Sequence, residues 1–305
     1  MKLSKKDSAF GRHETFPLRY SWLPKGFQEF QKNKKIFESD ESTVRLGVGK
    51  NMVSSIKYWM KATQLLDDQN ELTPLAHFLL DEDFGVDPYL EDESTIWLLH
   101  WLLSTNSKQS TTWFWFFNKY VSTEFDVSMM QVALESFIAD QLEIKPPSKV
   151  TLKNDCGVLT RMYSQEVGSS SLHSDDTLDS PMSLLGLVRK VDNKRFSAEL
   201  SSRPDLPIGI FGFALAQCIN EYTHDSSRST MPIKDLVYSI EGSPSAAAVF
   251  RLTEADFMTK IELLQHKYSN IFTIRETAGV SQIYLEQNSP IDCMSLLAAH
   301  YRGEL

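Results

Sequence analysis

Residues 41–66, ESTVRLGVGKNMVSSIKYWMKATQLL, contain the pattern that decides the expected fold. A short helix is expected over 41–46, and Gly47 and Gly49 then interrupt the chain. The following stretch, 50–66, carries apolar residues at helical spacing on one face and polar residues on the other. The stretch therefore predicts two helices joined by a tight glycine turn.

The surroundings of this pair complete the order of a winged helix-turn-helix. A first helix is expected over 19–33, and the polar stretch after Leu66 is typical of a hairpin, followed by a short helix over 75–80. The face of the 50–66 helix that is expected to be exposed carries polar and basic side chains. In DNA-binding helices, side chains of this kind contact phosphates and base edges. Two other interpretations stay open: a plain three-helix bundle with a soluble outer face, and a winged helix that binds protein.

The net charge is distributed unevenly along the 305 residues. The whole chain carries −9, but residues 1–66 hold 13 Lys/Arg and 6 Asp/Glu, a net +7. Residues 67–100 hold no Lys/Arg and 10 Asp/Glu, a net −10. The total charge argues against a nucleic-acid partner, whereas a basic N-terminal part of this size is able to hold a polyanion. An ordinary mixed-charge surface explains the same numbers.

The rest of the chain is expected to be mainly helical. Consecutive aromatic residues at 113–117 indicate a helix that is buried on most sides, or that lies at a domain or homodimer interface. Helices within 127–163, separated by a break, resemble the 41–66 pattern and predict a second helix-turn-helix-like unit. A helix is expected over 181–189, and two alternating runs around 277–279 predict a hairpin.

The expected fold class is α+β, mainly α with small β-hairpins, built from tandem winged helix-turn-helix-like units. The expected domains are an N-terminal winged-helix-like DNA-binding unit (1–86), a second helix-turn-helix-like helical unit (87–165), a Ser-rich linker or loop (166–180) and a C-terminal winged-helix-like domain (181–305). The three cysteines are far apart and lack metal-ligand spacing, which indicates reduced thiols in a cytoplasmic protein. The longest apolar run is too short to span a bilayer.

Several long blocks resemble a known family. They are FGRHETFPLRYSWLPKGF (10–27), LGVGKNMVSSIKYWMKA (46–62), LTPLAHFLL (72–80), DPYLEDESTIWLLHWLLST (87–105) and TWFWFFNKY (112–120). The chain is similar to the SspB-type family, the domain of unknown function that accompanies PAPS-reductase-like proteins in bacterial DNA phosphorothioation islands. The resemblance is dense over residues 10–165 and thin beyond them.

The resemblance implies a DNA-binding component of an antiphage phosphorothioation system. The partners it implies are DNA, a sulfur-transfer enzyme of the PAPS-reductase type, a cysteine desulfurase and an ATPase. It also implies that the protein nicks DNA, which opens the backbone to the sulfur-transfer machinery and usually needs a divalent metal, Mg²⁺ or Mn²⁺. The alternatives are a non-catalytic recruitment module and a transcriptional regulator of the same island, so the enzyme assignment stays open.

Candidate site residues follow from side-chain chemistry, because no catalytic set of the family maps onto this sequence residue by residue. His13 as general acid or base and Glu14 as metal ligand form the candidate catalytic pair. The alternative for both is structural, fastening the N-terminal arm onto the first helix. The candidate DNA-binding residues are Arg12, Arg19, Lys50, Asn51, Ser54, Ser55, Lys57, Tyr58 and Lys61.

Three carboxylates in the acidic stretch are candidate metal ligands. Asp87, Glu91 and Asp92 supply the oxygen atoms that hard divalent cations prefer. The alternative is that acidic residues at this position stabilise the N-terminus of the helix that follows.

Overall fold

The computed structural model describes residues 1–165, 180–226, 230–239, 242–267, 271–277, 279–285 and 290–304. The fold divides into two compact units. The N-terminal unit comprises Ser4–Phe116 and Tyr120–Glu199, and the C-terminal unit comprises Met1–Leu3, Phe117–Lys119 and Leu200–Leu305. The predicted Ser-rich linker lies outside the described residues, apart from Ser180. Every helix in the described ranges is too short or too polar to cross a bilayer.

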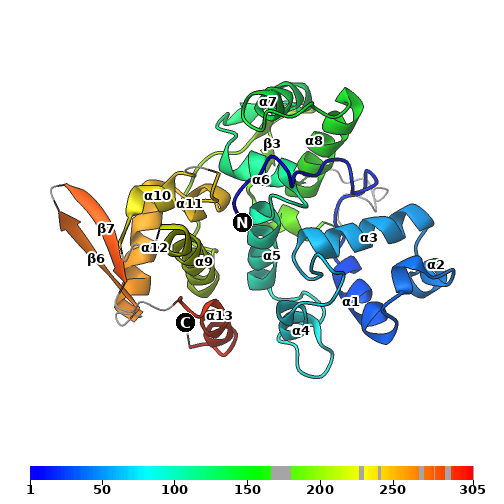
Figure 1. Ribbon diagram of the computed structural model, residues 1–305, viewed down its shortest axis with the longest axis horizontal. Helices are drawn as coiled ribbons and strands as arrows, with labels where there is room; N and C mark the ends of the chain where they lie inside the picture. Colours follow the sequence, from blue (N-terminus) through cyan, green and yellow to red (C-terminus); the bar gives the residue numbers. More distant parts are fainter. Residues whose placement is uncertain are drawn as a thin grey trace. The chain divides into compact units, whose positions relative to one another are not determined.

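Helices make up most of the N-terminal unit (Figure 1). They are α1 (Trp22–Lys32), the 3₁₀ turn η1 (Ile36–Glu38), α2 (Ser42–Leu46), α3 (Lys50–Ala62), α4 (Pro74–Leu80), α5 (Glu93–Thr105), α6 (Thr111–Asn118), α7 (Val127–Asp140), α8 (Lys149–Tyr163) and the 3₁₀ turn η2 (Pro181–Leu185). The strands described here are β1 (Glu124–Phe125), β2 (Ser164–Gln165), β3 (Val188–Lys190) and β4 (Phe196–Ser197), which form a small sheet in the order β1–β4–β3–β2. The pairs are antiparallel except for β2 with β3. The predicted α+β class, mainly helical with small sheets, is confirmed.

The core of the N-terminal unit contains two almost fully buried helices. In α5 every residue from Ser94 to Thr105 is buried. The aromatic side chains of Trp113–Phe117 in α6 are at most 3% exposed. Burial of this much aromatic surface is a large hydrophobic contribution to stability. The predicted burial of the aromatic helix is confirmed.

The two helices α2 and α3, joined at Gly47–Gly49, follow the predicted pattern, with a shorter second helix. α3 ends at Ala62, four residues before the expected end, because Gln64 adopts a left-handed φ of 58°. The N–H groups of Leu65 and Leu66 both bond to the carbonyl of Met60. The expected hairpin is reduced to one isolated bridge between Leu66 and Leu72. A winged-helix assignment for this unit is therefore not confirmed.

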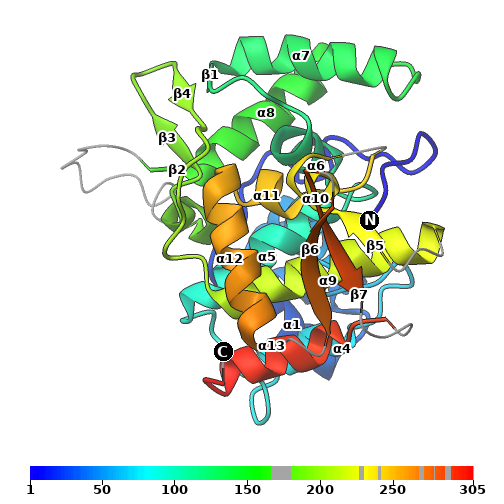
Figure 2. The same ribbon diagram turned by 90° about the vertical axis from the view of Figure 1, so that its left-hand side faces the viewer.

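The C-terminal unit combines helices with a three-stranded antiparallel sheet (Figure 2). Its elements are α9 (Ile208–Ser226), β5 (Thr230–Pro232), α10 (Ile233–Val237), α11 (Ala246–Val249), α12 (Glu254–Lys267), β6 (Phe272–Thr277), β7 (Val280–Leu285) and α13 (Cys293–Tyr301). The strand order is β5–β7–β6, and Thr277 pairs with Val280 at the end of the predicted hairpin. α13, for which the sequence predicted no element, packs mainly against α9.

The expected helix over 181–189 is wrong in type and length. The chain forms the 3₁₀ turn η2, and Gly186 ends it with a left-handed φ of 58°. Strand β3 begins two residues later and pairs with β2 and β4. A glycine that adopts the left-handed conformation is a common end to a helical turn.

Candidate nucleic-acid interface

The N-terminal half of α3 presents an exposed polar surface. Gly49 is the N-cap of this 13-residue helix, and Lys50, Asn51 and Ser54 follow as exposed residues. Val53, Ile56 and Trp59 point the other way and are buried. This apolar spacing holds α3 against the unit and leaves the Lys50 face open. The N–H groups of a helix N-terminus add partial positive charge, which favours a phosphate.

Ion pairs neutralise part of the basic character predicted from the sequence. Lys57 Nζ lies 3.2 Å from Glu38 Oε1, and Arg45 Nε lies 2.6 Å from Glu29 Oε2. Within the described residues, no ion pair involves Lys50. Exposed ion pairs contribute little to stability. Lys50 is therefore the cation on α3 that is most available to an external anion.

Two candidate DNA-binding residues are buried instead of lying on the exposed face expected for them. Ser55 is fully buried, and its hydroxyl donates a hydrogen bond to the carbonyl of His13 at 3.1 Å. Tyr58 is 8% exposed and lies against the rings of His13 and Trp59. Burial, with the nearby charge of Asp155, raises the pKa of Tyr58 well above its ordinary value. Both side chains therefore support the helix from inside.

The N-terminal arm, residues 4–16, is fixed by a buried polar cluster around His13. His13 and Asp155 of α8 are each 1% exposed, and His13 Nε2 lies 2.8 Å from Asp155 Oδ1. Asp155 also accepts hydrogen bonds from the Gly11 N–H at 2.9 Å and the Thr112 hydroxyl at 2.8 Å. His13 Nδ1 accepts from the Thr15 N–H at 3.1 Å. Because Nδ1 accepts, Nε2 carries the proton that is donated to Asp155.

A strained turn follows His13 directly. Glu14 and Thr15 have left-handed φ values of 50° and 66°, and the Phe16 N–H bonds to the His13 carbonyl at 2.9 Å. Left-handed φ at both central residues defines the type I′ turn, which usually contains Gly or Asn. For Thr, a β-branched residue, this conformation costs roughly 1–2 kcal/mol. The turn places both side chains in solvent while His13 stays in the core.

The two candidate phosphate clamps on the arm lie in different surroundings. Arg12 is exposed, and its Nη1 lies 3.3 Å from Gln109 Oε1. Arg19 is half-buried, with its guanidinium 5.6 Å from the ring centroid of Trp22. Arg12 is therefore the more accessible of the two.

Two of the three candidate metal carboxylates, Asp87 and Asp92, hold the N-terminus of α5. Asp87 is 5% exposed, and its two carboxylate oxygens accept from the N–H groups of Glu91 at 2.8 Å and Asp92 at 3.2 Å. Asp92 is the N-cap and accepts from the Ser94 N–H at 2.8 Å. In the described ranges, no group of three or more His, Cys, Asp or Glu residues could hold a metal ion. Asp87 and Asp92 thus fit the capping alternative, and the three carboxylates as a set do not fit a metal site.

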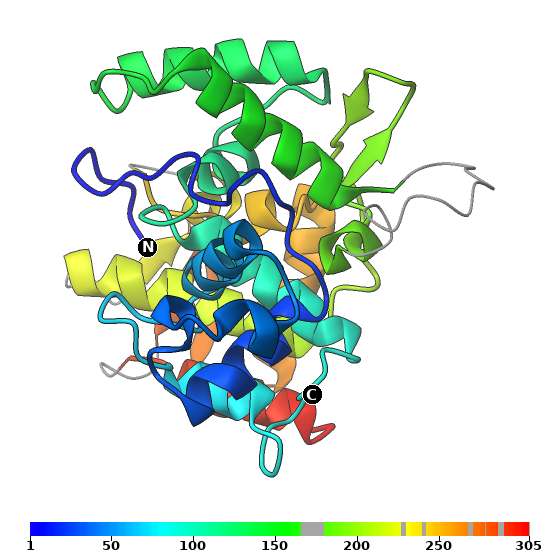
Figure 3. The same ribbon diagram turned by 90° about the vertical axis from the view of Figure 1, so that its right-hand side faces the viewer.

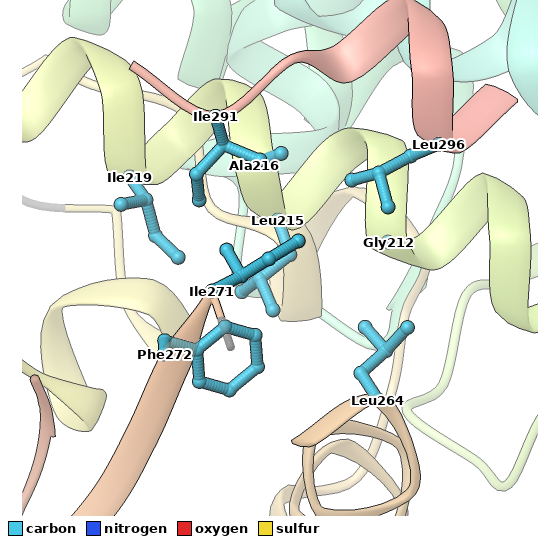
Figure 4. Close-up of a pocket in the computed structure, with 9 residues that line it drawn as sticks. All are labelled: Gly212, Leu215, Ala216, Ile219, Leu264, Ile271, Phe272, Ile291 and Leu296. Carbon is cyan, nitrogen blue, oxygen red and sulfur yellow. The ribbon is translucent and has the colours of Figure 1, made fainter. Parts of the chain in front are cut away.

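A pocket in the C-terminal unit offers no chemistry of its own. It encloses about 250 Å³ of empty space, part of it open solvent. The side chains that line it, among them Leu215 of α9, Leu264 of α12 and Phe272 of β6, are all apolar (Figure 4). Ligand sites usually combine such a surface with a few convergent polar groups. The polar residues of α3 and the arm are therefore the candidates for the functional site.

The sequence did not identify Asp155 or Thr112 as partners of His13. His13 and Asp155 are 142 positions apart in the sequence, and Thr112 and Asp155 are 43 positions apart. The local sequence gives one indication. Asp155 occupies a position of α8 where the spacing of apolar residues predicts a buried side chain, and a buried carboxylate needs a hydrogen-bond partner.

Comparison with known families identifies the chain. The family described as "Protein of unknown function (DUF4007)" matches residues 10–301. The chain belongs to this family. The comparison with curated proteins gave no match.

Two solved structures resemble the whole chain. An SspB crystal structure shares 28% sequence identity, with a TM-score of 0.81 over 97% of this chain and 88% of its own length. A magnesium ion-bound SspB crystal structure shares 27% identity, with a TM-score of 0.80 over 98% of this chain and 90% of its own length. The predicted SspB-type resemblance is confirmed, and it extends beyond residue 165, where the sequence blocks were thin.

Proposed function

We propose that the protein is the DNA-binding component of a bacterial DNA phosphorothioation system, and that the exposed N-terminal half of α3 binds the DNA backbone. The observation that carries the proposal is the exposed Lys50, which has no ion-pair partner in the part of the chain that the structure describes. It lies beside Asn51 and Ser54, at the start of the second helix of a helix-turn-helix. The SspB-like structure and the matching family support the setting. The proposed partners are those that the resemblance implies: a sulfur-transfer enzyme of the PAPS-reductase type, a cysteine desulfurase and an ATPase.

The C-terminal unit supports a winged-helix interpretation in its element order. The chain runs α9, β5, α10, α11, α12 and the β6–β7 hairpin, and β5 pairs with β7 at the edge of the sheet. The winged-helix order is a helix, a strand, further helices and then a hairpin. We propose this assignment for the C-terminal unit only, because the hairpin of the N-terminal unit has one bridge.

The DNA-binding proposal is tested with a labelled DNA duplex and fluorescence anisotropy. Lys50→Glu should raise the Kd roughly fivefold to tenfold near physiological salt, because one phosphate contact is lost and a repulsive charge is added. The slope of log K against log salt should become smaller by about 1. Lys194→Glu, an equal charge change at an exposed residue between β3 and β4, is the matched control. Equal Kd and equal slope for Lys50→Glu and wild type would contradict the assignment of α3.

In the catalytic form of this proposal, the protein also nicks the DNA with the help of Mg²⁺ or Mn²⁺. A non-catalytic recruitment module is the second candidate, and one observation favours it. His13 is buried in a satisfied cluster, and the carboxylates of Asp87 and Asp92 are bonded to backbone N–H groups. Relaxation of supercoiled plasmid by the purified protein, with each metal, separates the two. Relaxed plasmid supports nicking, and intact plasmid with full DNA affinity supports recruitment.

A further inference from the structure

Helix α8 carries a basic, exposed stripe that the proposed function does not use. Lys149, Lys153, Asn154 and Arg161 are all exposed along this 15-residue helix. At a rise of about 1.5 Å per residue, the stripe from Lys149 to Arg161 spans roughly 18 Å, the length of several phosphates on one strand. Within the described residues, no ion pair involves Lys149 or Lys153. The stripe is therefore a cationic surface without an internal counter-charge.

The acidic residue of α8 does not weaken this surface. Asp155 is 1% exposed and points to His13, Gly11 and Thr112 on the buried side. The exposed side of α8 has no carboxylate, in contrast to α7 and α12, where Asp140 and Glu262 are exposed. Charge segregation of this kind is typical of a helix that binds a polyanion.

Gly157 lies in the middle of the stripe, and Arg161 Nε donates to its carbonyl at 3.2 Å. It is an interior helical position, where Gly is less favourable than Ala. A Cβ atom built on Gly157 would meet no atom within 4 Å, so no neighbouring element needs the space. Gly in such a position lets a partner approach the helix backbone closely. The missing side chain thus leaves room for a partner on this face of α8.

The stripe is joined to the α3 surface through the arm. Arg161 Nη2 donates to the carbonyl of Thr15 at 2.9 Å, and Ser55 of α3 donates to the carbonyl of His13 at 3.1 Å. The arm therefore lies between α8 and α3, as Figure 3 shows for the dark blue segment between the green α8 and the blue helices. Two cationic helices on either side of a fixed arm can contact one duplex.

We propose that α8 is a second DNA-contacting helix, on which Lys149 and Lys153 bind phosphates and Gly157 lets the sugar-phosphate backbone approach. The proposal rests on the proposed DNA-binding function and extends it to a surface separate from Lys50. The ligand class is the phosphodiester backbone of duplex DNA, because the stripe offers cations and one amide but no aromatic side chain for stacking on bases.

The first experiment uses Gly157→Ala in the full chain. The variant should unfold at a higher urea concentration than wild type, because Ala is the better helix former and meets no clash. Its Kd for a DNA duplex should nevertheless rise at least threefold, and Gly157→Gln should raise it further. Ser136→Ala, on the exposed face of α7, is the control that improves helix propensity without changing α8. A more stable Gly157→Ala that binds DNA as wild type does would overturn the proposal.

The second experiment reverses charge with Lys149→Glu and Lys153→Glu together. The slope of log K against log salt should become smaller by about 2, one for each lost phosphate contact. A wild-type slope in this variant, together with a reduced slope in Lys50→Glu, would reject the role of α8 and leave the proposed function standing. Absence of salt-sensitive DNA binding by the wild-type protein would reject both.

Discussion

At the residue scale, the buried contact between His13 and Asp155 explains why a distinctive sequence block surrounds His13. Asp155 holds three donors from two segments: Gly11 and His13 of the arm, and Thr112 of α6. His13 is 1% exposed and Thr112 is fully buried, and a buried carboxylate is tolerated only when such partners satisfy it. The cluster therefore fastens the arm to α8 and α6. The structural alternative predicted from the sequence had the arm fastened to the first helix.

Replacing Asp155 by Ala tests this role. The variant leaves the buried donors of His13 and Thr112 without their acceptor, so the free energy of unfolding should fall by about 3–5 kcal/mol. Urea denaturation followed by tryptophan fluorescence measures the change. Glu14→Ala, one residue from His13 but exposed, should change stability by less than about 0.5 kcal/mol. Equal stability of Asp155→Ala and wild type would mean that the cluster does not hold the arm.

At the element scale, the helices of the N-terminal unit were predictable where the pattern was local. Gly47 and Gly49 mark the turn between α2 and α3, and consecutive aromatics mark α6 as buried. The end of α3 was missed because the backbone of Gln64 turns left-handed to bring Leu65 and Leu66 onto Met60, a tertiary requirement. Burial of Ser55 was missed because its acceptor, the carbonyl of His13, lies 42 residues away.

The N-terminus of α5 gives a prediction that separates capping from metal binding. Asp92→Ala should cost about 0.5–2 kcal/mol of stability because the Ser94 N–H loses its acceptor. Asp92→Asn should keep most of that stability, since Asn is an equally good N-cap. Thermal unfolding with and without Mg²⁺ checks both variants. A wild-type that gains stability from Mg²⁺, together with an Asp92→Asn that does not, would instead identify Asp92 as a metal ligand.

At the scale of the whole molecule, the net charge of −9 misleads because opposite charges meet within the fold. Lys34 of the basic segment lies against Glu71 of the acidic one, and Lys108 lies 4.0 Å from Asp68. The +7 of residues 1–66 is thus partly neutralised, and the cations that remain available are few and local. The sequence shows correctly which segments of the chain carry the positive and the negative charges. It had no means to predict which charges pair, because pairing depends on the tertiary fold.

The cysteines give a prediction for the two units separately. Cys156 lies in the N-terminal unit, and Cys218 and Cys293 lie in the C-terminal unit. Burial raises the pKa of all three, and that of Cys293 to about 11, so about one Cys293 thiol in a thousand is ionised at pH 8. Alkylation at pH 8 should therefore be slow in the folded protein and slowest at the buried Cys156 and Cys218. Mass spectrometry of each cysteine across a urea series should report the unfolding of each unit. Fast labelling of Cys218 without denaturant would contradict its burial.

The C-terminal unit includes Phe117–Lys119, a segment whose flanking residues on both sides belong to the other unit. The amide side chain of Asn118 accepts from the N–H of Ser245, which follows 127 positions later along the chain. At about 5–20 residues per second, a ribosome needs roughly 6–25 s to make the intervening segment. During that time Phe117, 1% exposed in the finished fold, has no completed unit to enter. Synthesis order thus leaves Phe117 without the residues that bury it until the C-terminal unit has been made.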